Sequence, residues 1–188
     1  MLPETAQATR PTTGPVPPPP TVRRGMPTSI VELELEGEAA TQVLAAALAA
    51  CARPGDVIAL SGPLGAGKTS FARGFIRARA AHMGAGEVGE VPSPTFTLVQ
   101  VYDIPGGAVW HVDLYRLEDE GEVFELGLED AFADAITLVE WPERAAGMLP
   151  AEKLDLVLSF GAEPDDRRAR LAGVGDWPER LRGLAPHG

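Results

Sequence analysis

The sequence contains little cysteine, little histidine and few aromatic residues. Its 188 residues include one cysteine and three histidines, and phenylalanine, tryptophan and tyrosine together make up 6%. A single cysteine excludes a disulfide within the chain and fits a reducing compartment. Because this residue, Cys51, lies in an alanine-rich apolar run, we interpret it as a small core residue rather than a catalytic thiol.

Positive charge is also scarce, since 16 Lys and Arg residues stand against 27 Asp and Glu residues, for a net charge of −11. Such an acidic surface repels nucleic-acid phosphates unless basic side chains cluster, so we expect neither DNA binding nor direct binding of RNA. No apolar run approaches the roughly 18 residues of a membrane span, and no continuous apolar core of a secretory signal is present. These absences predict a cytoplasmic protein without a membrane partner.

Proline is unevenly distributed along the chain. Eight of the 18 prolines lie within residues 1–27, where large apolar residues are scarce. Such a segment cannot bury enough apolar surface to offset the entropy of ordering it, so we predict a disordered, proline-rich tail. The remaining residues, 28–188, are long enough for one domain with a single sizeable core.

Apolar patterns after the tail alternate between strand-like and helix-like segments. Apolar and acidic residues alternate in Ile30–Glu36, which predicts a strand near a sheet edge, whereas Asp56–Gly62 is almost wholly apolar, as in a covered strand. We expect an α/β fold, with a mostly parallel central sheet, antiparallel flanking strands and helices on both faces. The other expected strands are Thr95–Ile104, Ala108–Leu117, Ala135–Trp141, Lys153–Phe160 and Arg167–Gly175, and the expected helices are Glu38–Ala52, Lys68–Ala81, short ones within Asp119–Ala133, and Trp177–Leu184.

Residues 62–69, GPLGAGKT, form the first motif that indicates a ligand. They match GxxxxGK(S/T) at every defined position, directly after an apolar strand and at the start of a helix, which is the context of a phosphate-binding P-loop. Glycines let successive N–H groups point at phosphates, and the helix N-terminus adds partial positive charge. We therefore predict a single P-loop NTPase-like domain, in which Lys68 supplies a cation to the β and γ phosphates and the Thr69 hydroxyl suits Mg²⁺.

A P-loop site also needs an acid to hold the metal, and the sequence offers two. Glu140 ends an apolar strand, where the metal-binding acid of such a site lies, although most such sites use aspartate. Asp113 lies in HVDLYR, where His111, Asp113 and Tyr115 would share one face of a strand. From spacing alone, either carboxylate could bind the metal with the other as its helper.

The segment PSPTFT, residues 92–97, is stiffened by two prolines, which favour extended backbone in the residues that flank them. Thr95 and Thr97 would then project to the same side. One interpretation is a loop threonine that senses the γ-phosphate and Mg²⁺, as in nucleotide switches. The other is an ordinary strand entry with β-branched residues, and the residues alone do not decide between the two.

Four segments in this order, GPLGAGKT, SPTFTLV, HVDLYR and VEWPE, resemble the TsaE family of bacterial ATPases of tRNA threonylcarbamoyladenosine biosynthesis. The resemblance extends from about Glu38 to Pro150. The last three elements make it specific, because a P-loop alone occurs in many enzymes. Arg167–Arg170 lies beyond the resemblance, and an arginine there could face the nucleotide or a partner.

The resemblance implies how the chain would bind its cofactors, ATP or ADP and Mg²⁺. Thr69 and Glu140 would bind Mg²⁺, which decides the choice of metal acid towards Glu140. Trp141 and the segment Glu38–Thr41 would lie near the base or ribose. The phosphates would be bound by Leu64, Gly65, Ala66, Gly67, Lys68 and Thr69.

The resemblance also implies the catalytic residues. Asp113 would lie by the γ-phosphate and the metal and support hydrolysis, together with Lys68. The residues Ser93–Thr97 would form a switch-like loop, in which Thr95 lies nearest the nucleotide.

The partners implied by the resemblance are TsaD and TsaB, the main subunits of a transferase complex, with tRNA reached only through that complex. Slow ATP hydrolysis by this chain would then sustain the turnover of the complex. The alternative is a small-molecule kinase with the same P-loop, although no lid insertion is evident. A GTPase would need an NKxD-type motif that is absent here, and a nucleotide-gated binding module would differ from an ATPase only in its rate.

Overall fold

The computed structural model describes residues 29–86, 88–117, 120–145 and 147–184, so the predicted tail at 1–27 lies outside the described residues. Apart from two strands discussed below, the predicted elements are found with ends within about two residues of those expected. The elements are β1 (Ser29–Leu35), α1 (Gly37–Cys51), β2 (Val57–Ser61), α2 (Lys68–His82), β3 (Val99–Tyr102), β4 (Val109–Asp113), α3 (Glu120–Phe124), α4 (Leu128–Asp134), β5 (Ile136–Glu140), η1 (Pro142–Ala145), β6 (Leu154–Phe160), β7 (Arg167–Gly173), α5 (Trp177–Arg180) and η2 (Leu181–Leu184).

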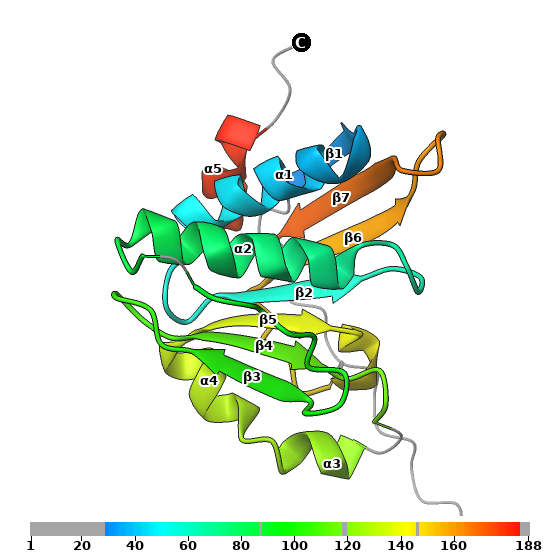
Figure 1. Cartoon of the computed structure of the whole chain (residues 1–188). Helices are drawn as coiled ribbons and strands as arrows, with labels where there is room; N and C mark the ends of the chain where they lie inside the picture. Colours follow the sequence, from blue (N-terminus) through cyan, green and yellow to red (C-terminus); the bar gives the residue numbers. More distant parts are fainter. Residues whose placement is uncertain (1–28, 87, 118–119, 146, 185–188) are drawn as a thin grey trace, which may run out of the picture.

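One sheet contains the seven described strands, in the order β1-β7-β6-β2-β5-β4-β3 (Figure 1). β2 pairs in parallel with β5 and with β6, and β4 pairs in parallel with β5. The pairs β1–β7, β6–β7 and β3–β4 are antiparallel. The predicted α/β fold with a parallel centre and antiparallel flanks is therefore confirmed, and the alternating strand β1 lies at an edge as expected.

Helices cover both faces of the sheet (Figure 1). α1, α2 and α5 contribute to the larger core cluster, which includes Phe71, Phe75 and Trp177. α3 and α4 contribute Val123 and Leu128 to a smaller cluster. All five residues of β5 and four of the five in β2 are buried, which explains why these strands read as continuous apolar runs. None of the described helices is long and apolar enough to cross a membrane.

The carboxyl ends of β2, β4 and β5 meet at one edge of the sheet. The strand register places Leu60 and Asp113 on either side of Glu140, so the ends of the three strands lie next to one another. In open α/β sheets, ligands bind in the crevice beyond such strand ends. Because the P-loop motif follows β2 directly, the fold brings the motif next to both candidate metal acids.

The strand expected from Thr95 is shorter than predicted, because β3 begins only at Val99. The residues before it form a turn, which a hydrogen bond from Leu98 N to Pro94 O closes at 2.6 Å. Proline fixes a φ that suits a turn, and short hydroxyl side chains hydrogen-bond locally in competition with a sheet. The expected projection of Thr95 and Thr97 from one side of a strand is therefore wrong.

The following strand also ends earlier than expected. β4 stops at Asp113, and Leu117 N then donates to Leu114 O at 3.1 Å in a turn. The Asp113 carboxylate takes part in this change, since its Oδ1 accepts a hydrogen bond from Tyr115 N at 3.0 Å, as aspartates do in turns. The single polar strand face expected for His111, Asp113 and Tyr115 is therefore wrong for Tyr115, which lies outside the strand.

Cys51 is the last residue of α1, and it is partly buried against the larger core cluster. Its Sγ donates a hydrogen bond to Leu48 O at 3.4 Å. Burial raises the pKa of the Cys51 thiol. A thiol with a raised pKa stays protonated near neutral pH and is a poor nucleophile, which supports a packing role for this residue.

Candidate functional site

The P-loop motif forms the turn between β2 and α2. Gly65 and Gly67 have φ angles of 80° and 100°, which lie in the left-handed region that glycine adopts without strain. A Cβ at Gly62 would lie 2.1 Å from the carbonyl oxygen of Leu158, so the close approach of the loop to β6 also requires glycine. The loop therefore presents the N-terminus of α2 at the sheet edge, an arrangement suited to an anion.

Lys68, the first residue of α2, is only 4% exposed. Its Nζ donates to the carbonyl oxygens of Gly62 and Pro63 at 2.7 and 3.0 Å and lies 3.9 Å from the centroid of the Trp141 ring. Burial lowers the pKa of Lys68, and neighbouring carboxylates, chiefly that of Glu140, oppose this effect. The ammonium group is thus held at the P-loop in a poorly hydrated position, where an anionic ligand would interact with it strongly.

Glu140, the last residue of β5, is 2% exposed and has a partner at each carboxylate oxygen. Its Oε2 accepts a hydrogen bond from Thr69 Oγ1 at 2.9 Å. Its Oε1 lies 2.8 Å from Nε2 of His111. The two side chains for which the sequence resemblance implies Mg²⁺ binding, Thr69 and Glu140, are therefore in direct contact.

Asp113, the last residue of β4, is 3% exposed and has a different set of partners. Its Oδ2 accepts a hydrogen bond from Thr95 Oγ1 at 2.6 Å, and Ser93 Oγ lies 2.9 Å from the same threonine oxygen. The first turn of α2 thus contacts one carboxylate, Glu140, and the turn before β3 contacts the other. This difference separates two candidate acids that the spacing of the sequence could not distinguish.

Trp141 follows Glu140 and adopts a φ of 59°, which is an outlier for a bulky residue. Its ring lies against that of Tyr115, with the two centroids 4.9 Å apart, and beneath the Lys68 ammonium. Backbone strain of this kind persists only where the surrounding structure imposes it, and it clusters at ligand sites. Trp141 therefore lines the site on the same side of the P-loop as Asp113 and Glu140.

Two pockets share the P-loop residues Gly65 and Gly67. One has a volume of about 270 Å³ and contains Lys68, Thr69, Thr95, Asp113, Glu140 and Trp141, so most of the predicted site residues come together here. The other has a volume of about 520 Å³, which is within the range of small-molecule sites. Its lining includes Glu38, Thr41, Gly65, Gly67, Asp165 and Arg167.

Sequence reasoning assigned no separate role to His111 and left the role of Arg167 open. Arg167 Nη2 donates to Gly65 O at 3.4 Å, and the guanidinium lies 5.2 Å from the centroid of the Phe160 ring. His111 is fully buried beside Glu140. The alternating pattern of β4 gave a signal for His111, but only the pairing of β4 with β5 reveals its partner.

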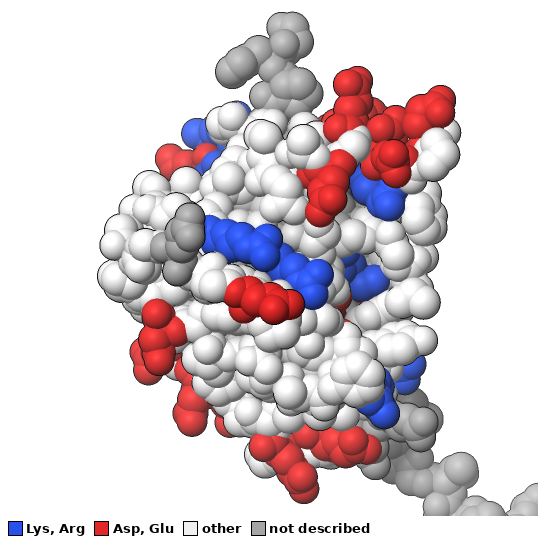
Figure 2. Space-filling view, in the orientation of Figure 1, with Lys and Arg blue, Asp and Glu red and all other residues white. Residues whose placement is uncertain are grey.

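Two of the three arginines that follow the P-loop on α2 have structural partners. Arg79 is buried and donates to the carbonyl oxygens of Ala49 and Ala52 near the end of α1. Arg73 Nε donates to Val91 O at 2.8 Å. Figure 2 shows a short basic strip on this face, with acidic side chains on either side of it. The face shown therefore offers no broad basic surface of the kind that nucleic acid requires.

The donor set around the P-loop fits Mg²⁺ rather than a metal held by protein ligands alone. Within the described ranges, no group of three or more His, Cys, Asp or Glu side chains is arranged to hold a metal ion. Mg²⁺ is usually bound through one or two carboxylates, with phosphates of a ligand and waters completing its octahedron. The hydroxyl of Thr69 and the carboxylate of Glu140 supply two hard oxygens of this type.

A profile of the family described as "Threonylcarbamoyl adenosine biosynthesis protein TsaE" matches residues 35–169. The match runs beyond the segment quoted from the sequence and includes β6 and the start of β7. The tRNA threonylcarbamoyladenosine biosynthesis protein TsaE of Bacillus subtilis is 39% identical over 142 residues, which cover 75% of this chain and 84% of that protein. The protein of the same name from Haemophilus influenzae is 40% identical over 116 residues, which cover 61% and 68%.

The fold is also that of a solved structure. The crystal structure of Bacillus subtilis YdiB superposes with a TM-score of 0.67 at 30% sequence identity, and the match covers 85% of this chain and 96% of that one. Sequence and fold thus agree over most of the described residues. The chain belongs to the TsaE family of threonylcarbamoyl adenosine biosynthesis proteins.

Proposed function

We propose that this chain is a Mg²⁺-dependent ATP-binding and ATP-hydrolysing accessory protein of tRNA threonylcarbamoyladenosine biosynthesis. It would act with a complex of TsaD and TsaB, sustain the turnover of that complex, and reach tRNA only through it. The observation that carries the proposal is the contact between Thr69 of the P-loop and Glu140, next to the buried cation of Lys68. Membership of the TsaE family supports the assignment to this pathway.

The P-loop would hold the phosphates of ATP or ADP. Its backbone N–H groups in residues 64–69 and the ammonium of Lys68 are donors suited to phosphate oxygens. Thr69 and Glu140 would hold Mg²⁺, because both offer hard oxygen ligands at the same point. Mg²⁺ in this position would neutralise part of the charge on the phosphates.

Asp113 would serve as the base. Its carboxylate lines the same pocket as Lys68 and Glu140, and a carboxylate there can orient a water and accept its proton. In the described structure, the hydroxyl of Thr95 already occupies Asp113 Oδ2. The turn that contains Thr95 therefore controls access to the base, and a partner that moves this turn would change the rate of hydrolysis.

The larger pocket suits the nucleoside part of ATP. Glu38 and Asp165 accept hydrogen bonds, so they favour ribose hydroxyls and base amino groups and disfavour a further phosphate. The guanidinium of Arg167 is planar and can stack on a base. We therefore assign base and ribose to this pocket and the triphosphate to the pocket with Lys68. In this assignment Trp141 belongs to the phosphate side.

The alternative, a small-molecule kinase, would need arginines that neutralise a transferred phosphate. Arg73 and Arg79 do not fit this role, since both side chains are engaged with backbone carbonyls away from the acids.

The experiment that tests the proposal measures ATP hydrolysis with Mg²⁺, by the protein alone and with its own TsaD–TsaB pair. Stimulation by the pair is the expected result. No stimulation, with label from ATP appearing on a small molecule in cell extract, would favour the kinase.

Glu140→Gln should weaken the Mg²⁺-dependent part of nucleotide binding by at least about tenfold, or about 1.4 kcal/mol. The amide keeps a side chain of the same shape but removes the negative charge that attracts the cation. Calorimetric titration with ADP, with and without Mg²⁺, measures the effect. Asp113→Asn is the matched control, since it should keep the response to Mg²⁺ while hydrolysis falls. A normal response in Glu140→Gln and a lost one in Asp113→Asn would transfer the metal role to Asp113.

Thr95→Ala should reduce stimulation by TsaD–TsaB more than it reduces affinity for nucleotide. The substitution frees Asp113 Oδ2 from the turn, so the position of the turn no longer controls the base. We expect stimulation to fall about tenfold while the Kd for ADP changes by less than about twofold, a difference of roughly 0.4 kcal/mol. Thr97→Ala is the control, because within the described part of the chain this exposed threonine only accepts a hydrogen bond from Gln100. Equal losses of affinity and stimulation in Thr95→Ala would make Thr95 a plain ligand.

A further inference from the structure

His111 has no role in the proposed mechanism, but it contacts Glu140, the proposed metal-binding acid. His111 is fully buried in β4, and its Nε2 lies 2.8 Å from Glu140 Oε1. The parallel pairing of β4 with β5 produces this contact, since Asp113 lies opposite Glu140 and His111 precedes it on the same side of the strand. The contact is thus built into the sheet rather than into a surface loop.

The hydrogen bond to Glu140 is the one polar contact of the His111 ring among the described residues. Nδ1 is buried and has no hydrogen-bond partner there. Because a carboxylate accepts, Nε2 carries a proton and donates it. A buried imidazole nitrogen without a hydrogen-bond partner makes the folded protein less stable than an apolar side chain of similar size at the same position would. A purely structural role in the core would not require a histidine at this position.

We propose that His111 is a positioning residue for the metal site, which fixes the carboxylate of Glu140 so that Oε2 stays directed at Thr69 and the P-loop. The inference rests on the proposed role of Glu140 as a Mg²⁺ ligand. A glutamate at a strand end can rotate about three side-chain torsions. A hydrogen bond at Oε1 restricts this rotation and so fixes the direction of Oε2. Groups that orient metal ligands in this way typically contribute about 10–100-fold to metal affinity.

A second effect follows from the position of Lys68. The buried ammonium of Lys68 and the buried carboxylate of Glu140 line the same pocket. A carboxylate released from His111 could rotate towards Lys68 and compete with phosphate for it. The hydrogen bond from His111 therefore keeps the Glu140 carboxylate available to Mg²⁺ and the Lys68 ammonium available to the nucleotide. Without this hydrogen bond, the two groups would no longer be kept apart.

The test compares His111→Leu with His111→Gln. Leucine removes the donor, whereas glutamine places an amide N–H near the position of Nε2. We measure by calorimetry the Mg²⁺ concentration that gives half of the metal-dependent increase in ADP affinity. His111→Leu should raise this concentration about 10–100-fold, and His111→Gln should recover most of the loss. Affinity for ADP without Mg²⁺ should change by less than about twofold in His111→Gln.

Val112→Ala is the control for a general loss of packing, because Val112 is buried in the same strand and belongs to the cluster on the opposite face. It should lower the melting temperature without changing the Mg²⁺ requirement. His111→Asn, whose amide is too short to reach Glu140, replaces the leucine variant if that variant does not fold, and the same shift is expected.

The outcomes separate this inference from the proposed function. If Mg²⁺ does not strengthen ADP binding to the wild-type protein, the proposed metal site itself is wrong. If Mg²⁺ acts on the wild type and His111→Leu or His111→Asn needs the same concentration, the positioning role is overturned and the metal site stands. A shift in Val112→Ala as large as that in the histidine variants would also overturn it, since loss of packing would then suffice.

Discussion

Lys68→Ala should reduce the affinity for ATP and ADP by at least about 100-fold, or about 2.7 kcal/mol, so that binding is no longer detected at micromolar nucleotide. Lys68 is the one basic side chain among the described residues that line the pocket with Asp113 and Glu140. Without it, two buried carboxylates would face the phosphates with no cationic side chain between them. Calorimetric titration with ADP at fixed ionic strength measures the loss.

Arg77→Ala is the matched control for this prediction. Arg77 lies on the same helix as Lys68, but its side chain is exposed, and the substitution removes the same unit of charge. A screened surface charge contributes little at physiological ionic strength, so the affinity should change by less than about twofold. Unchanged nucleotide affinity in Lys68→Ala would contradict the P-loop assignment. Equal losses of affinity in both variants would show that the change in net charge alone causes the effect.

The parts of the site that the sequence predicted are those that depend on neighbouring residues in the chain. The order of apolar strand, glycine-rich turn and helix located the P-loop between β2 and α2. The apolar run that ends in Glu140 located the buried end of β5. In both cases local backbone geometry and burial act over a few residues, which a sequence pattern records directly.

Sequence patterns failed where a local hydrogen bond competes with the sheet. Thr95 has a residue type that is common in strands, but its hydroxyl bonds to Asp113 and the chain turns between Pro94 and Leu98. Tyr115 continues the alternation of β4 in sequence, but its N–H bonds to the Asp113 carboxylate and the strand ends. A local oxygen thus accepts from a backbone N–H that strand pairing would otherwise satisfy: the carbonyl of Pro94 for Leu98, and the carboxylate of Asp113 for Tyr115.

Contacts between distant segments are the remaining part that the sequence could not supply. Arg167 approaches Gly65 from 102 residues further along the chain, and His111 approaches Glu140 from 29 residues before it. Neither approach follows from the pattern of one segment, because each depends on which strands become neighbours in the sheet. The strand order, with β5 between β2 and β4 and β6 on the other side of β2, determines both.

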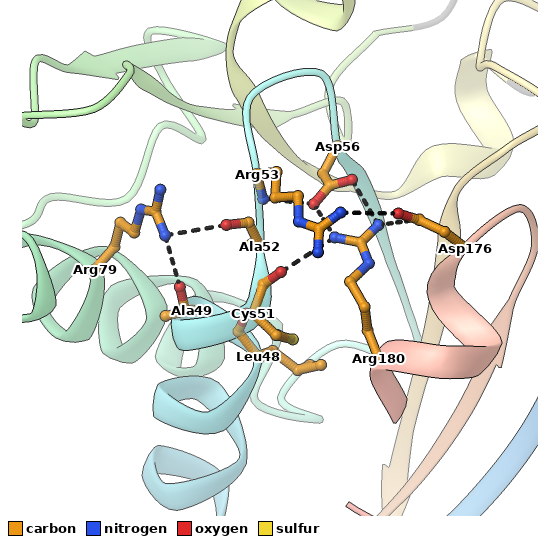
Figure 3. A network of polar contacts seen from close by, with 9 residues as sticks. All are labelled: Leu48, Ala49, Cys51, Ala52, Arg53, Asp56, Arg79, Asp176 and Arg180. Atoms are coloured by element: carbon orange, nitrogen blue, oxygen red, sulfur yellow. Dashed lines mark hydrogen bonds and ion pairs between the residues drawn. The ribbon is translucent and has the colours of Figure 1, made fainter. Parts of the chain in front are cut away.

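Arg180→Ala should lower the free energy of unfolding by about 3 kcal/mol, because it breaks a largely buried ion pair. The side chain of Arg180 is 7% exposed and binds both oxygens of Asp56, at 2.5 and 2.8 Å, as well as Asp176 and the carbonyl oxygen of Cys51 (Figure 3). It also lies 3.8 Å from the centroid of the Trp177 ring. Its removal leaves the 12% exposed carboxylate of Asp56 without its cation. Urea unfolding measures the loss.

Arg53→Ala is the control that distinguishes a buried cation from an exposed one in the same network (Figure 3). The Arg53 side chain is 67% exposed and contacts Asp176 at 3.3 Å, so its loss should cost less than about 0.5 kcal/mol. Asp56 precedes β2 and the P-loop follows it, so the two lie at opposite ends of that strand, and ADP affinity of the folded Arg180→Ala protein should match the wild type. Equal, small losses of stability in both variants would show that water solvates the Asp56 carboxylate well enough to replace its cation. A selective loss of ADP affinity would show instead that this network transmits its geometry through β2 to the site.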